Sequence, residues 1–211
     1  MKFTKFGHSC VLIQEGNVRT LLDPGSYSTG QNDVHDIDIV VITHEHQDHL
    51  DMDSLRAVLR NNPKVKVITN TAVGALLKKE GIPFSVVEDG RQLEEKGMSI
   101  EGVGEKHALI HSSIALAQNT GYFLAGKFFY PGDALTLPSK SVEILGLPAA
   151  APWAKISEII DYALAVRPRV CIPLHDGILR TPGMMGALVG RILEPAGIRF
   201  MQLELNREYE L

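Results

Sequence analysis

The sequence that decides the fold runs Ile37-Asp38-Ile39-Val40-Val41-Ile42-Thr43-His44-Glu45-His46-Gln47-Asp48-His49. Its first six residues make an apolar run that is typical of a buried strand. Its last six residues contain three histidines and one aspartate, and Leu50-Asp51-Met52-Asp53 then predicts the start of a helix. A loop between a strand and a helix is a usual place for catalytic groups on a rigid scaffold. Imidazole and carboxylate are also the ligands of zinc, iron and manganese sites.

Length and composition indicate one domain, residues 1–211, with a sizeable core. Of the 211 residues, 45% are apolar and 22% are charged. The formal charge of −4 gives no general basic surface, so nucleic acid is not an expected partner. Residues 1–6 lack the apolar core of a signal peptide, and no run approaches the roughly 18 apolar residues of a membrane span. We therefore expect a cytoplasmic protein without a membrane partner, in which Cys10 and Cys171 are buried free thiols.

The first half of the chain predicts strands followed by alternating helices and strands. Residues 2–22 predict two or three strands with a hairpin turn at Glu15-Gly16-Asn17. Asp51 or Asp53 is a candidate N-cap for a helix that runs to about Asn61. Further along the chain we expect a strand at 65–68, a helix at 71–80 and a strand at 84–87.

The second half repeats this order. The expected strands are 98–104, 113–117, 121–125, 128–130, 144–147, 170–172 and 198–205. The expected helices are 156–166 and 183–193. Two sheets that lie face to face, with helices outside them, would satisfy the pattern of both halves.

The loop after the buried strand offers part of the ligand set of a metal centre. In a loop the side chains at 44, 46, 48 and 49 can point in several directions, whereas a helix would put 44 and 46 on different faces. A zinc site with an open position usually has three protein ligands, so further groups are needed. Candidates stand at the ends of three predicted strands, namely His107, Asp133 and His175. These seven groups suffice to bind two divalent metals. The part of the metal charge that Asp48, Asp133 and a bridging hydroxide do not neutralise would attract an anionic substrate or stabilise an oxyanion.

At these residues the chain resembles the metallo-β-lactamase fold superfamily. The resemblance is carried by residues 43–49, with Leu22-Asp23-Pro24 before them and Gly132-Asp133 and Pro173-Leu174-His175 after them. Gly7-His8-Ser9-Cys10 and the chain length are most similar to the short metal-dependent hydrolase branch, which includes the ascorbate-6-phosphate lactonase-like proteins. The resemblance covers nearly the whole chain.

The resemblance implies an α/β (α+β) fold, a four-layer αββα sandwich of two mixed β-sheets with the metal site at one edge. It implies that His44, His46 and His107 hold one metal and that Asp48, His49 and His175 hold the other. Asp133 then bridges the two ions. Two divalent ions are expected, Zn²⁺ first, with Mn²⁺ or Fe as further options.

Several side chains near these ligands have more than one interpretation. His111 is the alternative to His107 as the third histidine, and would otherwise line the pocket or be exposed. Asp23 fits turn chemistry and fits equally a carboxylate that orients a ligand histidine through its other ring nitrogen. His8 could be a core histidine, an orienting group or a substrate contact. Trp153 could wall the pocket or make a core or lid contact.

The reaction expected from these groups is metal-dependent hydrolysis. A bridging hydroxide would attack an ester, lactone or phosphoester-type bond, and Asp48 would orient it and later carry a proton. The alternatives are an iron-dependent oxidoreductase of the same fold, an RNA- or DNA-cleaving phosphodiesterase, and a metal-binding scaffold without turnover.

The substrate is expected to be a small molecule, and a homo-oligomer remains an option. The candidate walls of the substrate pocket are residues 24–36, 108–112, 134–153 and 176–185. The basic side chains in or near these walls are few, namely Lys140, Lys155 and Arg180.

Overall fold

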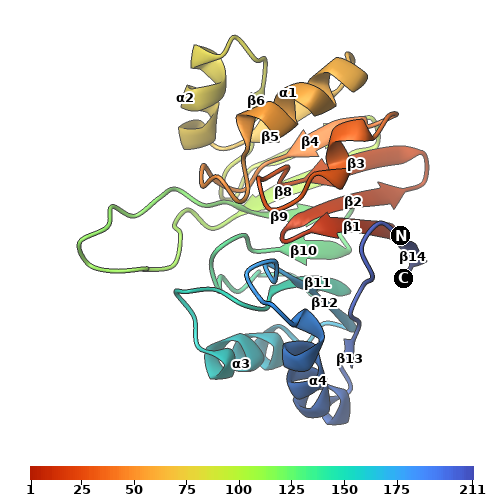
Figure 1. Ribbon diagram of the computed structural model, residues 1–211, viewed down its shortest axis with the longest axis vertical. Coiled ribbons are helices and arrows are strands. Elements are labelled where there is room, and N and C mark those ends of the chain that lie inside the picture. The colour runs from red at the N-terminus through yellow and green to blue at the C-terminus, as the bar shows by residue number, and fades with distance from the viewer.

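Two seven-stranded sheets lie face to face in the computed structural model of the chain (Figure 1). The structure describes the backbone of residues 1–211 and every side chain except those of Pro182, Met184 and Met185. The first sheet has the order β14-β1-β2-β3-β4-β5-β6 and the second the order β13-β12-β11-β10-β9-β8-β7. Each sheet is mixed, with three antiparallel pairings at one end and three parallel pairings at the other.

The strands of the first sheet are β1 (Lys2–Gly7), β2 (Cys10–Glu15), β3 (Val18–Leu22), β4 (Ile39–Val41), β5 (Lys66–Thr69), β6 (Ser85–Val86) and β14 (Glu208–Glu210). Those of the second sheet are β7 (Gln92–Glu95), β8 (Met98–Val103), β9 (Gly121–Leu124), β10 (Phe128–Tyr130), β11 (Ile144–Pro148), β12 (Val170–Leu174) and β13 (Arg199–Phe200). The short 3₁₀ helices are η1 (Gly30–Asp33) and η2 (Glu194–Ala196).

Helices cover the outer face of each sheet. On the first sheet lie α1 (Met52–Asn61) and α2 (Thr71–Lys79), and on the second lie α3 (Ile156–Val166) and α4 (Pro182–Leu193) (Figure 1). The first two helices begin at N-caps, since the side chains of Asp51 and Asn70 accept backbone hydrogen bonds from Ser54 and Val73. The four-layer αββα sandwich expected from the sequence is therefore confirmed.

Three apolar clusters hold the four layers together. The central cluster joins the inner faces of the two sheets and includes Phe3, Tyr122 and Tyr130. A second cluster packs the second sheet against α3 and α4, and a third packs the first sheet against α1 and α2. Each large apolar side chain that is fully buried in this way contributes roughly 1.5–3 kcal/mol.

Strand direction brings the loops that follow eight strands to one edge of the sandwich. β3, β4 and β5 are parallel, so their carboxyl ends share one edge of the first sheet, and β1 runs in the same direction through two antiparallel pairings. β8, β10, β11 and β12 share a direction in the second sheet for the same reason. The edge at the carboxyl ends of parallel strands is where α/β sheets bind ligands.

The structure also corrects several of the predicted strands. Residues 113–117 are a loop, because the two positions beside β9 are already taken by β8 and β10, and only an isolated bridge between Lys106 and Gln118 forms nearby. The predicted strand at 198–205 is reduced to β13. β7 and β14 were not predicted, because both are short and rich in charged residues. Within the described residues, no helix is both long and apolar enough to cross a bilayer.

Candidate metal centre

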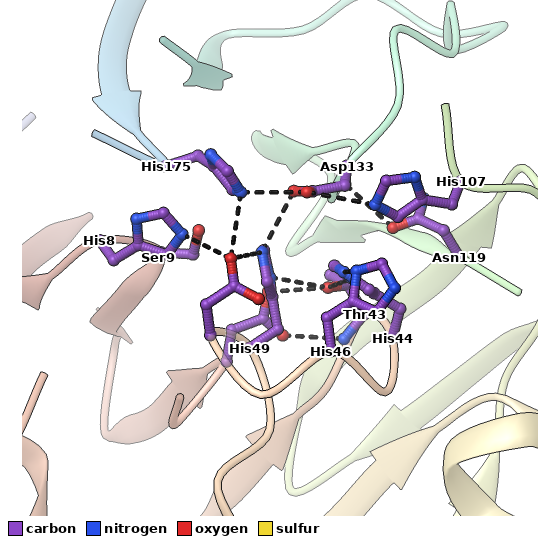
Figure 2. A network of polar contacts seen from close by, with 12 residues as sticks. His8, Ser9, Thr43, His44, His46, His49, His107, Asn119, Asp133 and His175 are labelled. Carbon is purple, nitrogen blue, oxygen red and sulfur yellow. Dashed lines mark hydrogen bonds and ion pairs between the residues drawn. The ribbon is translucent and has the colours of Figure 1, made fainter. Parts of the chain in front are cut away.

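The seven predicted ligands come together at the shared edge of the two sheets, and Figure 2 labels all of them except Asp48. The loop after β4 brings four of them, His44, His46, Asp48 and His49. The other three, His107, Asp133 and His175, follow β8, β10 and β12. His111 lies outside the cluster, because its side chain is exposed and its Nδ1 contacts the Ser113 hydroxyl.

His44, His46 and His107 form what we call the first ligand group, with one ring nitrogen of each within 4.8 Å of the others. His44 Nε2 and His46 Nδ1 lie 3.2 Å apart. Two nitrogens bound tetrahedrally to one zinc ion, each at about 2.0–2.1 Å, lie roughly 3.3–3.4 Å apart. The spacing of the two rings thus fits a shared ion.

Asp48, His49 and His175 form the second ligand group. Asp48 Oδ2 lies 3.5 Å from His175 Nε2 and 3.9 Å from His49 Nε2. His8 Nε2 also falls within the 4.8 Å limit of this group.

Asp133 reaches both ligand groups. Its Oδ1 lies 3.1 Å from His49 Nε2, and its Oδ2 lies 3.0 Å from His175 Nε2 and 3.3 Å from His107 Nε2. The side-chain amide of Asn119 helps to place Asp133, because its Oδ1 accepts from the Asp133 backbone N–H at 3.0 Å. This position fits a bridge between two ions.

The hydrogen bonds on the far side of each ring show which nitrogen is free. Nδ1 of His107 and Nδ1 of His175 each donate to a backbone carbonyl at 2.6 Å, that of Ala108 and that of Ala150. Nδ1 of His49 donates to Asp23 Oδ2 at 2.7 Å. A neutral imidazole that donates from Nδ1 has its lone pair on Nε2, which is the ligand form.

The inward atoms of these side chains lack well-aligned partners. Among the described residues, no partner makes a well-aligned hydrogen bond with the buried Nε2 atoms of His49, His107 and His175 or with the Oδ1 of Asp133. Buried polar atoms in proteins are normally paired, so orphaned atoms that converge on one place call for a further group. A cation is the group that lone pairs and carboxylate oxygens both accept, and these residues therefore fit divalent metals.

Asp23 supports the loop that carries the first four ligands. Its side chain is fully buried at the end of β3 and accepts from Thr43 N and Thr43 Oγ1, each at 2.8 Å, as well as from His49. The Thr43 hydroxyl donates to Asp23, so it accepts from Nδ1 of His44 at 3.0 Å. The contact with His49 has the geometry of the orienting carboxylate that was one of two expectations.

Trp153 lies beside the ligands rather than in the core. Its Nε1 donates to Asp133 Oδ2 at 2.9 Å, and its ring centroid is 6.0 Å from that of His107 and 6.4 Å from that of His175. The side chain is half-buried, which places it at the wall of the site.

One buried ion pair beside the centre was missed by the sequence analysis. Lys5 Nζ donates to Asp176 Oδ1 at 2.5 Å and to the Pro173 carbonyl at 2.8 Å, on both sides of His175. Both side chains are almost fully buried. The signal was present, because strand alternation puts Lys5 on the same face as Phe3.

The site is strongly charged without a metal. Burial favours the neutral form of His175, but the nearby carboxylates of Asp133 and Asp48 outweigh it and raise the pKa of His175 to about 9. Burial opposes the charged form of His49 too, yet Asp133 and Asp23 raise its pKa well above the usual value. In the first ligand group, burial lowers the pKa of both His44 and His46. Protons therefore occupy His49 and His175 at neutral pH and are largely absent from His44 and His46.

Comparisons with known proteins show the family and the fold of the chain. The β-lactamase superfamily domain matches residues 2–175. Protein Rv0786c of Mycobacterium tuberculosis is 36% identical over 208 residues, which cover 96% of each chain. A UPF0173 metal-dependent hydrolase of Nanoarchaeum equitans is 25% identical over 201 residues and 83% of each chain. The solved structure of Igni18, a metallo hydrolase of Ignicoccus hospitalis, is similar in fold with a TM-score of 0.76 at 20% identity, over 100% of this chain and 98% of that one.

Proposed function

We propose that this chain, which belongs to the β-lactamase superfamily as a metal-dependent hydrolase of the metallo-β-lactamase fold, cleaves an ester or lactone bond at a dinuclear centre. The observation that carries the proposal is the convergence of the orphaned Nε2 atoms of His49, His107 and His175 on Asp133. The ligands would be the first group for one ion, the second group for the other, and Asp133 for both. Zn²⁺ suits this set best, because imidazole dominates it.

When bound, the metals supply a Lewis acid and lower the pKa of water toward about 7. Asp48 is the proposed catalytic residue, since its carboxylate is 24% exposed and faces His49 and His175, whereas that of Asp133 is 4% exposed. It orients the attacking water, accepts a proton from it on a carboxylate oxygen, and returns a proton to the oxygen of the leaving alcohol. Trp153 shields Asp133 from solvent on one side.

The loops around the centre favour a substrate with an apolar body. We call residues 24–36, 108–117, 134–143 and 176–181 the rim loops, because each directly follows Asp23, His107, Asp133 or His175. Among the described side chains, the rim loops hold seven of the eleven exposed large apolar residues, namely Tyr27, Leu109, Ile110, Ile114, Leu116, Leu137 and Ile178. Such a concentration beside a reaction centre is a feature of binding sites.

Charge is scarce on the same loops. Residues 107–120 contain no Asp, Glu, Lys or Arg. Lys140, one of the basic side chains of the rim loops, pairs with Glu101. An acyl chain suits such loops better than a phosphorylated group does, so the proposed substrate differs from the anionic substrate expected from the sequence.

The test is a substrate panel on zinc-loaded protein, with p-nitrophenyl acetate, p-nitrophenyl octanoate, aliphatic lactones, bis(p-nitrophenyl) phosphate and RNA. We expect ester or lactone turnover that chelation removes and zinc restores, with kcat/KM about tenfold or more higher for octanoate than for acetate. Leu109→Ser with Ile110→Ser should reduce that preference. Val86→Ser, at an apolar residue on the edge strand β6 whose exposure lies between those of Leu109 and Ile110, is the matched control.

Three outcomes would contradict the proposal. Cleavage of phosphodiester or RNA without ester or lactone turnover would indicate the phosphodiesterase alternative. Oxygen consumption by iron-loaded protein, without hydrolysis by the zinc form, would indicate the oxidoreductase. Full metal occupancy with no turnover on the whole panel would indicate a binding scaffold.

A further inference from the structure

His8 lies in the turn between β1 and β2, beside His175 (Figure 2). Its ring lies between the backbone amide of Gly177 and Asp48, a ligand of the second group. Its Nδ1 is 3.1 Å from the Gly177 N–H, and its Nε2 is 3.1 Å from Asp48 Oδ2. The side chain is buried, and its ring centroid lies 4.0 Å from that of His175. The His8 carbonyl also accepts from His175 N at 3.1 Å.

The amide of Gly177 fixes the tautomer of His8. A backbone N–H can only donate, so Nδ1 of His8 must present its lone pair to Gly177. The neutral ring then carries its proton on Nε2, which donates to the carboxylate of Asp48. The opposite arrangement holds in His49, His107 and His175, where Nδ1 donates outward and Nε2 is free.

From this contrast we infer that His8 is a positioning residue for Asp48 and does not bind metal, although its Nε2 lies within ligand distance of the second group. A nitrogen that holds a proton has no lone pair for an ion. The Nε2–H instead holds Oδ2 of Asp48 in one orientation, which fixes the direction of its other oxygen. The catalytic part of this inference rests on the proposed hydrolysis, whereas the tautomer and the exclusion from the ligand set do not.

A methyl group added at Gly177 would disturb the contact between His8 and Asp48. A Cβ built on Gly177 would lie 3.0 Å from the Cβ and 3.1 Å from the Nδ1 of His8. Gly177→Ala keeps the amide donor but pushes the ring of His8, so it perturbs Asp48 without removing any polar atom.

The direct readout is a two-dimensional ¹H–¹⁵N NMR spectrum of histidine side chains in the zinc-loaded protein. We expect His8 to show a protonated Nε2 and no zinc-bound nitrogen, and its signals to be identified by their loss in His8→Gln. A zinc-bound Nε2 on His8, or the loss of one zinc equivalent in His8→Ala, would overturn the inference.

Kinetics test the positioning role. We expect His8→Ala to lower kcat about 10- to 100-fold with little change in KM and no change in zinc content. His8→Gln should recover most of the loss, because its amide nitrogen can take the place of Nε2, and Gly177→Ala should lower kcat without changing zinc content. His35→Ala, at an exposed histidine, is the control. Unchanged kcat in His8→Ala would refute the positioning role, while absence of turnover in the wild type would refute the proposed function and leave the NMR result standing.

Discussion

The first ligand group is oriented by its neighbours in the sequence, whereas the second is oriented by distant parts of the chain. Thr43 supports His44, and the Ala108 carbonyl supports His107, each from one residue away. His49 relies on Asp23, and His175 relies on the backbone carbonyls of Ala150 and His8. The β1–β2 turn and the buried Lys5–Asp176 pair both hold the loop that carries His175.

Two ions bound at this site would therefore depend on different parts of the fold. The first group should survive changes in β1 that disturb the second. The second group should respond to substitutions that touch no ligand, because its supports cross from the first sheet to the second.

The largest effect is expected where the two groups meet, at Asp133. Asp133→Asn removes the negative charge that reaches both groups, so both ions should bind more weakly and turnover should fall on the order of 10³-fold. Zinc content after dialysis and kcat/KM on the best ester would measure it. Asp161→Asn, at an exposed position on α3, is the control. Retention of two zinc ions with wild-type turnover would show that Asp133 is not a shared ligand.

Lys5→Met tests the buried ion pair that supports the loop of His175, and thus the second ligand group. The substitution leaves the buried carboxylate of Asp176 unpaired, which should cost about 3–5 kcal/mol in the free energy of unfolding. Urea unfolding of the metal-free protein would measure it. Lys2→Met, on the same strand with an exposed pair to Glu208, should change stability little. Equal effects of the two substitutions would contradict a structural role for the buried pair.

Asp23→Asn tests the orientation of His49. The loss of the charged acceptor at Nδ1 should weaken zinc binding at the second group about 10- to 100-fold, with a smaller effect on the first. Competition titrations with a zinc chelator can separate the groups, in a His46→Ala background for the second and a His49→Ala background for the first. The same loss in both backgrounds would mean that Asp23 only holds the loop.

The smallest expected difference between the two ligand groups is in the number of protons that zinc binding releases. His175 has a pKa of about 9 and that of His49 is also raised, so both are protonated at pH 7 in the metal-free protein. Zinc binding at the second group should release on the order of two protons, and affinity should rise with pH up to about 9. Burial lowers the pKa of His44 and His46, so the first group should release few. Calorimetry in buffers of different ionisation enthalpy measures this, and equal release by both groups would refute the contrast.

The first group was more accessible to sequence analysis than the supports of the second. The apolar run at 37–42 and the strand ends before His107, Asp133 and His175 are local patterns, and they predicted the layers and the residues that converge. The choice between His107 and His111 needed the structure, because both follow the same strand.

The role of His8 could not be predicted, because it depends on an amide 169 residues away. The strand predicted at 113–117 was wrong for a similar reason, since apolar residues form a strand only where a partner is free. Local patterns therefore predict which groups carry the chemistry, and tertiary contacts decide how each is held.

The most direct test of two metal sites held by these two groups is anomalous X-ray diffraction from crystals of the zinc-loaded protein. We expect two anomalous peaks about 3.5–4 Å apart, one among His44, His46 and His107 and one among Asp48, His49 and His175, with Asp133 between them. A single peak in fully loaded and active protein, or a peak bound to His8, would contradict the account.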